Sequence, residues 1–105
     1  MSATLVSSNT TIKVNAAVAG SGSSSSGTLY TAPANGYAII HWGTTSYSSG
    51  TYTISIDGLQ IASLTTSQPF QPAGGFYVGP GKSVTYTNSG TVTIVVKGVE
   101  FINTP

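Results

Sequence analysis

The sequence of 105 residues predicts a single all-β domain, an antiparallel sandwich or barrel. Two observations predict this fold class. Strong helix formers are scarce, whereas β-branched and aromatic residues are abundant. Short stretches of alternating apolar and polar residues are separated by Gly, Pro, Asn and Ser at roughly ten-residue spacing. No run approaches the ~18–20 apolar residues of a membrane helix, so we expect no membrane partner.

Charge is sparse, and this excludes several functional classes. The charged residues are Lys13, Asp57, Lys82, Lys97 and Glu100, with neither arginine nor cysteine. Scattered lysines do not neutralise nucleic-acid phosphates, and without cysteine there is no disulfide framework or thiolate metal site. The N-terminus has neither a basic nor an apolar region of a signal peptide, so we expect synthesis in a cytoplasm. A net charge near zero gives little electrostatic protection against self-association.

The first 19 residues are expected to form an N-terminal strand or arm. Residues 2–8 suit either a short edge strand or an extended arm, and residues 10–19 suit a strand better. Alternation would place three apolar residues on one face of that strand and two polar ones on the other: Ile12, Val14 and Ala16 against Lys13 and Asn15. Residues 20–27 are a Gly/Ser-rich run that favours a loop over a linker.

The segment Tyr30–Trp42 is the most informative stretch of the chain. A turn built on Pro33 and Asn35-Gly36 leads into a strand that is apolar on both faces. Alternation divides the strand into two sets: Tyr37, Ile39 and His41 on one side, and Ala38, Ile40 and Trp42 on the other. A small domain readily covers one apolar face with its own core, so the second predicts a subunit interface.

Residues 51–64 predict a β-hairpin, because Asp57-Gly58 is a two-residue type I′ turn signal. In that register Ile56 faces Leu59, and the next core-side pairs are Ile54 with Ile61 and Tyr52 with Ser63. The opposite, wetter face would then carry Thr51, Thr53, Ser55, Gln60 and Ala62.

The remaining sequence predicts a loop and three strands. Residues 65–75 form the loop, with Phe70 as its anchor, and residues 76–78 a short strand. Residues 82–87 form a strand with Val84 and Tyr86 inward. In the last strand, 91–102, a β-bulge at Lys97-Gly98 is expected to return two residues, Val99 and Phe101, to the face of Val92, Ile94 and Val96.

Catalytic chemistry finds little support among these residues. Asp57 is explained by its turn, Glu100 lies on a strand, and the single histidine, His41, has no partner in sequence. No Gly-x-Ser-x-Gly elbow occurs, and a metal site requires about three or four suitable ligands. We therefore expect a protein that is not an enzyme and that binds neither cofactor nor metal.

The order of features resembles a known family. The features are a Pro33-Ala34-Asn35-Gly36 turn before an apolar strand, the Asp-Gly hairpin, a Gly79-Pro80-Gly81-Lys82 turn, and a closing G-T-V-T-I-V-V-K-G-V-E-F strand. Over residues 28–103 they resemble the jelly-roll modules of C1q/TNF-like trimeric domains, and more closely small structural proteins of tailed bacteriophages. The resemblance implies a jelly-roll-like sandwich of about eight strands and a homotrimer, with aromatic residues near the threefold axis.

The expected function follows from this resemblance and from the second apolar face. We expect a capsid decoration or cement protein of a phage virion that binds junctions of the major capsid protein. The alternative is a receptor-binding tail-fibre or baseplate tip domain. It would recognise host glycans through exposed Tyr30, Trp42 and Tyr47, which would stack on sugars, and through Asn and Gln side chains, which would hydrogen-bond to them. The candidate subunit-interface residues are Tyr37, Ile39, His41, Trp42, Tyr86 and Phe101.

Overall fold

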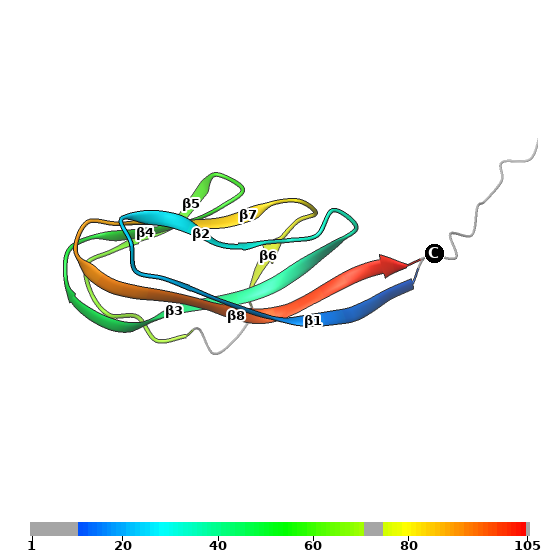
Figure 1. Ribbon diagram of the computed structural model, residues 1–105, viewed down its shortest axis with the longest axis horizontal. Coiled ribbons are helices and arrows are strands. Elements are labelled where there is room, and N and C mark those ends of the chain that lie inside the picture. The colour runs from blue at the N-terminus through cyan, green and yellow to red at the C-terminus, as the bar shows by residue number, and fades with distance from the viewer. Residues whose placement is uncertain (1–10, 71–74, 105) are drawn as a thin grey trace, which may run out of the picture.

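Eight strands pack as two four-stranded antiparallel sheets in the computed structural model, which describes residues 11–70 and 75–104 (Figure 1). Sheet A has, in order, β1 (Thr11–Gly22), β8 (Thr91–Thr104), β3 (Gly36–Ser49) and β6 (Phe76–Val78). Sheet B has, in order, β2 (Ser26–Thr31), β7 (Ser83–Asn88), β4 (Tyr52–Ile56) and β5 (Leu59–Leu64).

This strand order is that of a jelly roll. Successive strands alternate between the two sheets except at the β4–β5 hairpin, so nearly every connection crosses from one layer to the other. The first and last strands, β1 and β8, pair side by side in sheet A. The expected all-β, antiparallel sandwich of about eight strands is confirmed.

The core lies between the sheets and is built by strict alternation along the central strands. In β3, Ala38 and Ile40 are fully buried, and in β4 Tyr52 and Ile54 are as well. The buried hydrophobic residues are Val18, Leu29, Ala32, Ala38, Ile40, Trp42, Tyr52, Ile54, Ile56, Val78, Val84, Tyr86, Val92, Ile94 and Val96. Val84 and Tyr86 face inward as the sequence predicted.

The N-terminal region differs from expectation in two ways. β1 pairs with β8 from Thr11 to Gly22, so it takes in the first part of the Gly/Ser run, while Ser26 and Gly27 belong to β2. The expected eight-residue loop therefore shortens to residues 23–25. A bulge at Asn15 then turns Ala16 away from Ile12 and Val14, so these three do not share a face. The arm expected at residues 2–8 lies outside the described residues.

The hairpin turn is confirmed, but its register slips beyond the first pair. Asp57 has φ +53° and Gly58 φ +75°, as a type I′ turn requires, and Ile56 pairs with Leu59. Ile61 is an extra residue in a bulge, so Ile54 faces Ala62 and Tyr52 faces Leu64. The predicted Ile54–Ile61 and Tyr52–Ser63 pairs are wrong, and so is the placement of Ala62 on the wetter face, because Ala62 packs against the core.

The last strand also lacks the expected bulge. β8 pairs with β3 without interruption from Lys97 to Ile102, so residues alternate regularly past Gly98. Val92, Ile94 and Val96 face the core, whereas Val99 and Phe101 lie on the opposite side of the sheet. A glycine in a strand had suggested a bulge, but here it permits close approach: a Cβ at Gly98 would lie 2.1 Å from the carbonyl oxygen of Ile39.

Replacing Gly58 by alanine should destabilise the fold through its backbone alone. The residue has φ +75°, and a Cβ there would meet no atom within 4 Å. We expect Gly58→Ala to lower the free energy of unfolding by ~1 kcal/mol in denaturant titrations, because L-residues with side chains avoid this conformation. Gly58→Asn is the matched control. It should lower the free energy of unfolding by less than Gly58→Ala does, because Asn tolerates positive φ. Equal losses for the two variants would contradict this account of the turn.

Candidate interaction face

The outer face of sheet A carries apolar side chains on all four strands and becomes polar toward Ser46 and Thr93. Directly paired residues in neighbouring strands share a face, so the register identifies which side chains point away from the core. On β1 and β8 they include Ile12, Val14, Ala17, Ala19, Val95, Lys97, Val99 and Phe101. On β3 and β6 they include Tyr37, Ile39, His41 and Tyr77.

Several of these side chains are exposed in the single chain. Val14 is 65% exposed, Tyr77 60%, Ile12 56% and Val99 38%. Soluble monomers rarely present contiguous apolar patches larger than a few hundred Å², and larger patches mark interaction sites. The outer face of sheet A therefore has the character of a surface that another molecule covers.

Three aromatic rings form a row across the middle of this face. The Tyr37 ring lies 5.5 Å from the Tyr77 ring and 5.1 Å from the Phe101 ring, centroid to centroid. The rings come from β3, β6 and β8, so they bridge most of the width of the sheet. Contacts of this kind are typical of aromatic pairs and hold the rings in place before any partner arrives.

Among the described residues of this face, Lys97 is the one with a formal charge, and it lies on β8 opposite His41 on β3. The Lys97 ammonium lies 4.1 Å from the centre of the Phe70 ring, a cation–π contact. Gly43 makes room for the segment that carries Phe70, because a Cβ there would come within 3.0 Å of the Phe70 nitrogen. Phe70, the predicted anchor of its loop, thus packs on the outer face of sheet A.

The outer face of sheet B has the opposite character. Its outward positions carry hydroxyl or amide side chains: Ser26, Thr28, Thr31, Thr53, Ser55, Gln60, Ser63, Ser83, Thr85 and Thr87. Two pairs bond across strands, Thr31 with Ser83 at 2.8 Å and Thr53 with Thr87 at 2.5 Å. One face of the sandwich is therefore suited to water and the other to a partner.

The six interface candidates divide between this face and the core. Tyr37, Ile39, His41 and Phe101 lie on the outer face of sheet A. Trp42 is 3% exposed and Tyr86 4% exposed between the sheets, because alternation turns both inward, so neither contributes to that face.

Sequence reasoning missed other members of the outer face. Tyr77 gave no usable signal, because β6 has only three residues and its alternation is too short to read. Val99 was assigned to the core side through the bulge expected at Lys97-Gly98. The sequence placed Val14 on the apolar face of its strand. Its position opposite Phe101 became known only from the register of β1 and β8.

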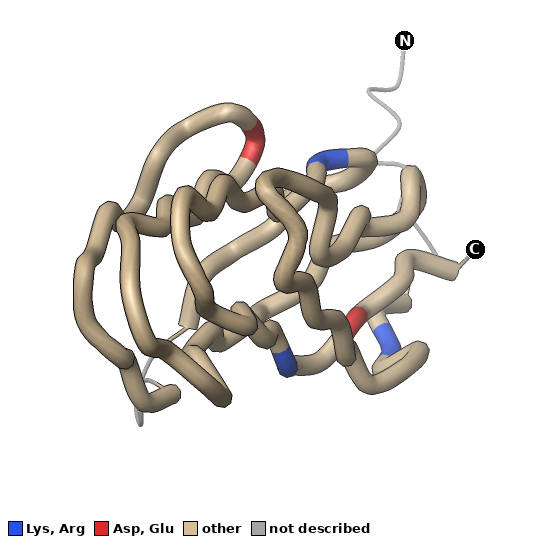
Figure 2. The backbone as a smooth tube through the Cα atoms, turned by 60° about the vertical axis from the view of Figure 1, so that its left-hand side comes forward, with Lys and Arg blue, Asp and Glu red and all other residues tan. Residues whose placement is uncertain are grey.

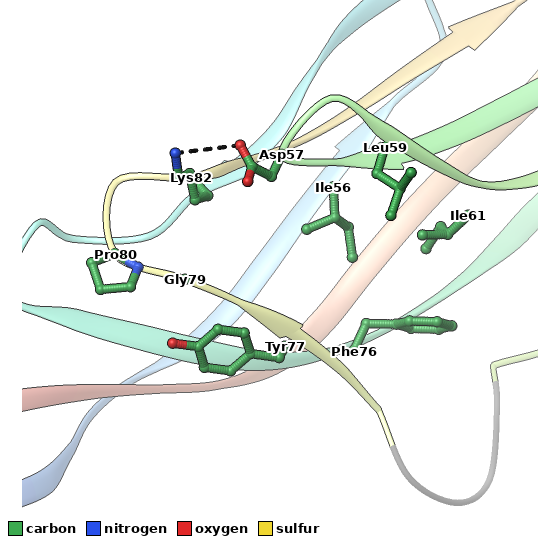
Figure 3. A pocket seen from close by; sticks show the side chains of 9 residues that line it. All are labelled: Ile56, Asp57, Leu59, Ile61, Phe76, Tyr77, Gly79, Pro80 and Lys82. Atoms are coloured by element: carbon green, nitrogen blue, oxygen red, sulfur yellow. Dashed lines mark ion pairs between the residues drawn. The ribbon is translucent and has the colours of Figure 1, made fainter.

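A pocket opens between the free edges of the two sheets, at β5 and β6 (Figure 3). It has a volume of about 420 Å³, and its walls include Ile56, Leu59, Ile61, Phe76 and Tyr77. Figure 3 shows the first three side chains facing the two aromatic rings across the opening. An ion pair of 3.4 Å between Lys82 and Asp57 marks its rim.

The titratable groups that catalysis would need lie in different parts of the fold, and Figure 2 shows the charged residues spread along the backbone. His41 is on the outer face of sheet A, and Asp57 is at the hairpin turn. Glu100 is on β8, where its side chain bonds to Tyr30 of β2. Within residues 11–70 and 75–104, no three His, Asp or Glu residues gather as a metal site would require. The same residues contain no helix able to cross a membrane.

Glu100 ties the two sheets together at one end of the sandwich. Its carboxylate accepts hydrogen bonds of 2.5 Å from the Tyr30 hydroxyl and from the Asn15 amide. The bond from Tyr30, followed by that from Asn15, lowers the pKa of Glu100. Burial, followed by the bond to Glu100, raises the pKa of Tyr30. Both groups are therefore held in the forms that bond, a carboxylate and a neutral phenol.

Comparison of the chain with models of known protein families, with curated proteins and with solved structures gave no match in any of the three. The fold and the outer face of sheet A together define the class of protein: a jelly-roll β-sandwich in which the outer face of one sheet carries apolar side chains.

Removing the Tyr30 hydroxyl should destabilise the protein in a pH-dependent way. Because the pKa of Glu100 is lowered by folding, its stabilisation is present above the unfolded-state value of ~4.3 and is lost as pH falls through the folded-state pKa. We expect Tyr30→Phe to lower the free energy of unfolding by about 1–3 kcal/mol at neutral pH and by less below pH ~4.

The matched control is Tyr47→Phe, because the Tyr47 hydroxyl donates a 2.7 Å bond to the neutral carbonyl of Gly50. In denaturant titrations, Tyr47→Phe should lower the free energy of unfolding by the same amount at every pH in this acid range. A constant loss for Tyr30→Phe as well would show that the Glu100 carboxylate does not stabilise the sheet-to-sheet link.

Proposed function

We propose that this protein is a non-enzymatic structural module that assembles as a homotrimer through the outer face of sheet A. The observation that carries the proposal is the contrast between the two outer faces. Sheet A presents apolar side chains around Tyr37, Val99 and Phe101, whereas the outward positions of sheet B carry hydroxyls or amides. A chain with few charges has little to oppose self-association, so a second copy is the natural cover for such a face.

We further propose that the trimer is a capsid decoration or cement protein of a phage particle. The support is the jelly-roll order, the resemblance in residues 28–103, and a candidate face without the carboxylate pairs or histidine partners of catalysis. The trimer would bind junctions of the major capsid protein and add buried area across neighbouring subunits. Stabilisation of the shell would then come from binding alone.

The alternative proposal is a glycan-binding tail tip, and its three aromatic candidates give it less support than the outer face of sheet A gives to assembly. Trp42 is buried in the core, the Tyr30 hydroxyl is bonded to Glu100, and the Tyr47 ring packs against the core. A sugar-stacking platform needs an exposed ring face. Tyr30 and Tyr47 are half-buried, and Trp42 is enclosed.

Placing a charge in the middle of the outer face of sheet A should abolish assembly. We expect the unaltered protein to sediment as a trimer at micromolar concentration and Val99→Asp to sediment as a monomer, because burying an unpaired carboxylate is strongly unfavourable. Thr28→Asp is the matched control on the outer face of sheet B and should remain trimeric, since Thr28 is exposed there. An unaltered protein that sediments as a monomer would overturn the proposal.

The decoration role predicts an effect on whole particles. Particles that lack the protein should lose infectivity at a lower temperature than complete particles, because the subunit junctions lose buried area. Complete particles should also contain hundreds of copies, counted by quantitative mass spectrometry. Unchanged heat survival, or only a few copies per particle, would contradict a cement role.

A further inference from the structure

We infer that the contact between copies is made by β1 of one copy docking into the pocket between β5 and β6 of the next, with Ile12 and Val14 as the inserted side chains. This inference rests on the proposed homotrimer and identifies the residues that would hold it together. It assigns an occupant to a pocket that the single chain leaves open.

The pocket favours an uncharged, apolar occupant. Its volume of about 420 Å³ falls within the range of binding pockets, and its floor is the core residue Ile56, which is 9% exposed. At its mouth Leu59 is 70% exposed. The rim charges, Asp57 and Lys82, are paired with each other at 3.4 Å, so they leave no net charge for an ionic ligand.

The chain carries a matching apolar projection on β1. All of the first seven residues of β1 are exposed, and Figure 1 shows the ends of β1 and β8 continuing beyond sheet B. Ile12 and Val14 point to the outer side of sheet A and are 56% and 65% exposed. Neither has a charged neighbour on that side, because they pair with Asn103 and Phe101.

The pocket and the outer face of sheet A are continuous through one residue. Tyr77 lines the pocket, and its ring also lies 5.5 Å, centroid to centroid, from that of Tyr37, the central ring of the aromatic row. A neighbouring copy that covers the outer face therefore reaches the pocket without crossing a polar gap. This continuity is the reason for assigning the pocket to a second copy.

The positions of the two surfaces also indicate how copies are arranged. β1 and β6 are the opposite edges of sheet A, so each copy offers its pocket at one edge and its apolar projection at the other. A copy that uses both meets two different neighbours. Such heterologous contacts close into a ring when the rotation between copies permits, and three copies give the proposed trimer.

Site-specific cross-linking tests this contact cleanly, because the chain has no cysteine of its own. Val14→Cys and Leu59→Cys alter exposed side chains, so both variants should fold. Mixed and treated with a short bismaleimide, they should yield a linked pair joined between positions 14 and 59, identified by mass spectrometry. A chain with both cysteines should give a covalent product that stops at three chains. Thr28→Cys mixed with Leu59→Cys is the matched control and should give none.

The outcomes separate this inference from the proposed function. If 14–59 links are absent while the protein still sediments as a trimer, the inferred contact is overturned and the trimer stands. If each variant instead links to itself, the contact is between like surfaces and the inference fails. A doubly substituted product that stops at two chains would support the contact and overturn the threefold state. A monomer in sedimentation, without links, overturns both.

Discussion

The pairing of β3 with β8 is the constraint on which the rest of the structure depends. The ladder runs through the middle of sheet A from Gly36 opposite Ile102 to Ser49 opposite Thr91. One side of it supplies Ile40, Trp42 and Ile94 to the core, and the other supplies Tyr37, Ile39 and Phe101 to the outer face. Between Gly36 and Thr44 the side chains of β3 alternate without a bulge, so a slip of one residue there would exchange the two sets.

The outer faces of the two sheets differ in polarity. Sheet B keeps its outer face wet with serine and threonine hydroxyls, some of which bond across strands. Lys97 is the charged residue among the described residues on the outer face of sheet A, so most of the side chains of that face can be buried at little electrostatic cost. The link from Tyr30 to Glu100 joins the sheets at one end, on the inner side of β8, and so leaves the outer face free. The assembly proposed above would bury the apolar part of the outer face of sheet A and leave the outer face of sheet B in water.

Bulges account for most of the differences between the predicted and the observed structure. The sequence placed a bulge at Lys97-Gly98 where the chain has none. It gave no sign of the irregularities that the strand register shows at Asn15, Leu29, Thr45, Ser48 and Ile61. A bulge forms where two strands with unequal numbers of residues must keep their apolar sides aligned, so its position depends on the partner strand. Glycine alone does not locate it: Gly98 serves close packing against the backbone of β3. Each misplaced bulge reversed the facing of the residues beyond it, which moved Val99 and Phe101 from core to surface.

The sequence by itself determined the all-β class, the Asp57-Gly58 turn and the two-sided apolar character of residues 37–42, because turn chemistry and alternation are properties of neighbouring residues. Which of the two sides faces the core was decided only by tertiary structure. Trp42 and Tyr37 are comparable aromatic residues on opposite sides of β3, and one is enclosed by sheet B while the other is left on the outer face. The row of Tyr77, Tyr37 and Phe101 and the pocket beside it arise from strands distant in sequence, whose register is set by the packing of the two sheets as a whole.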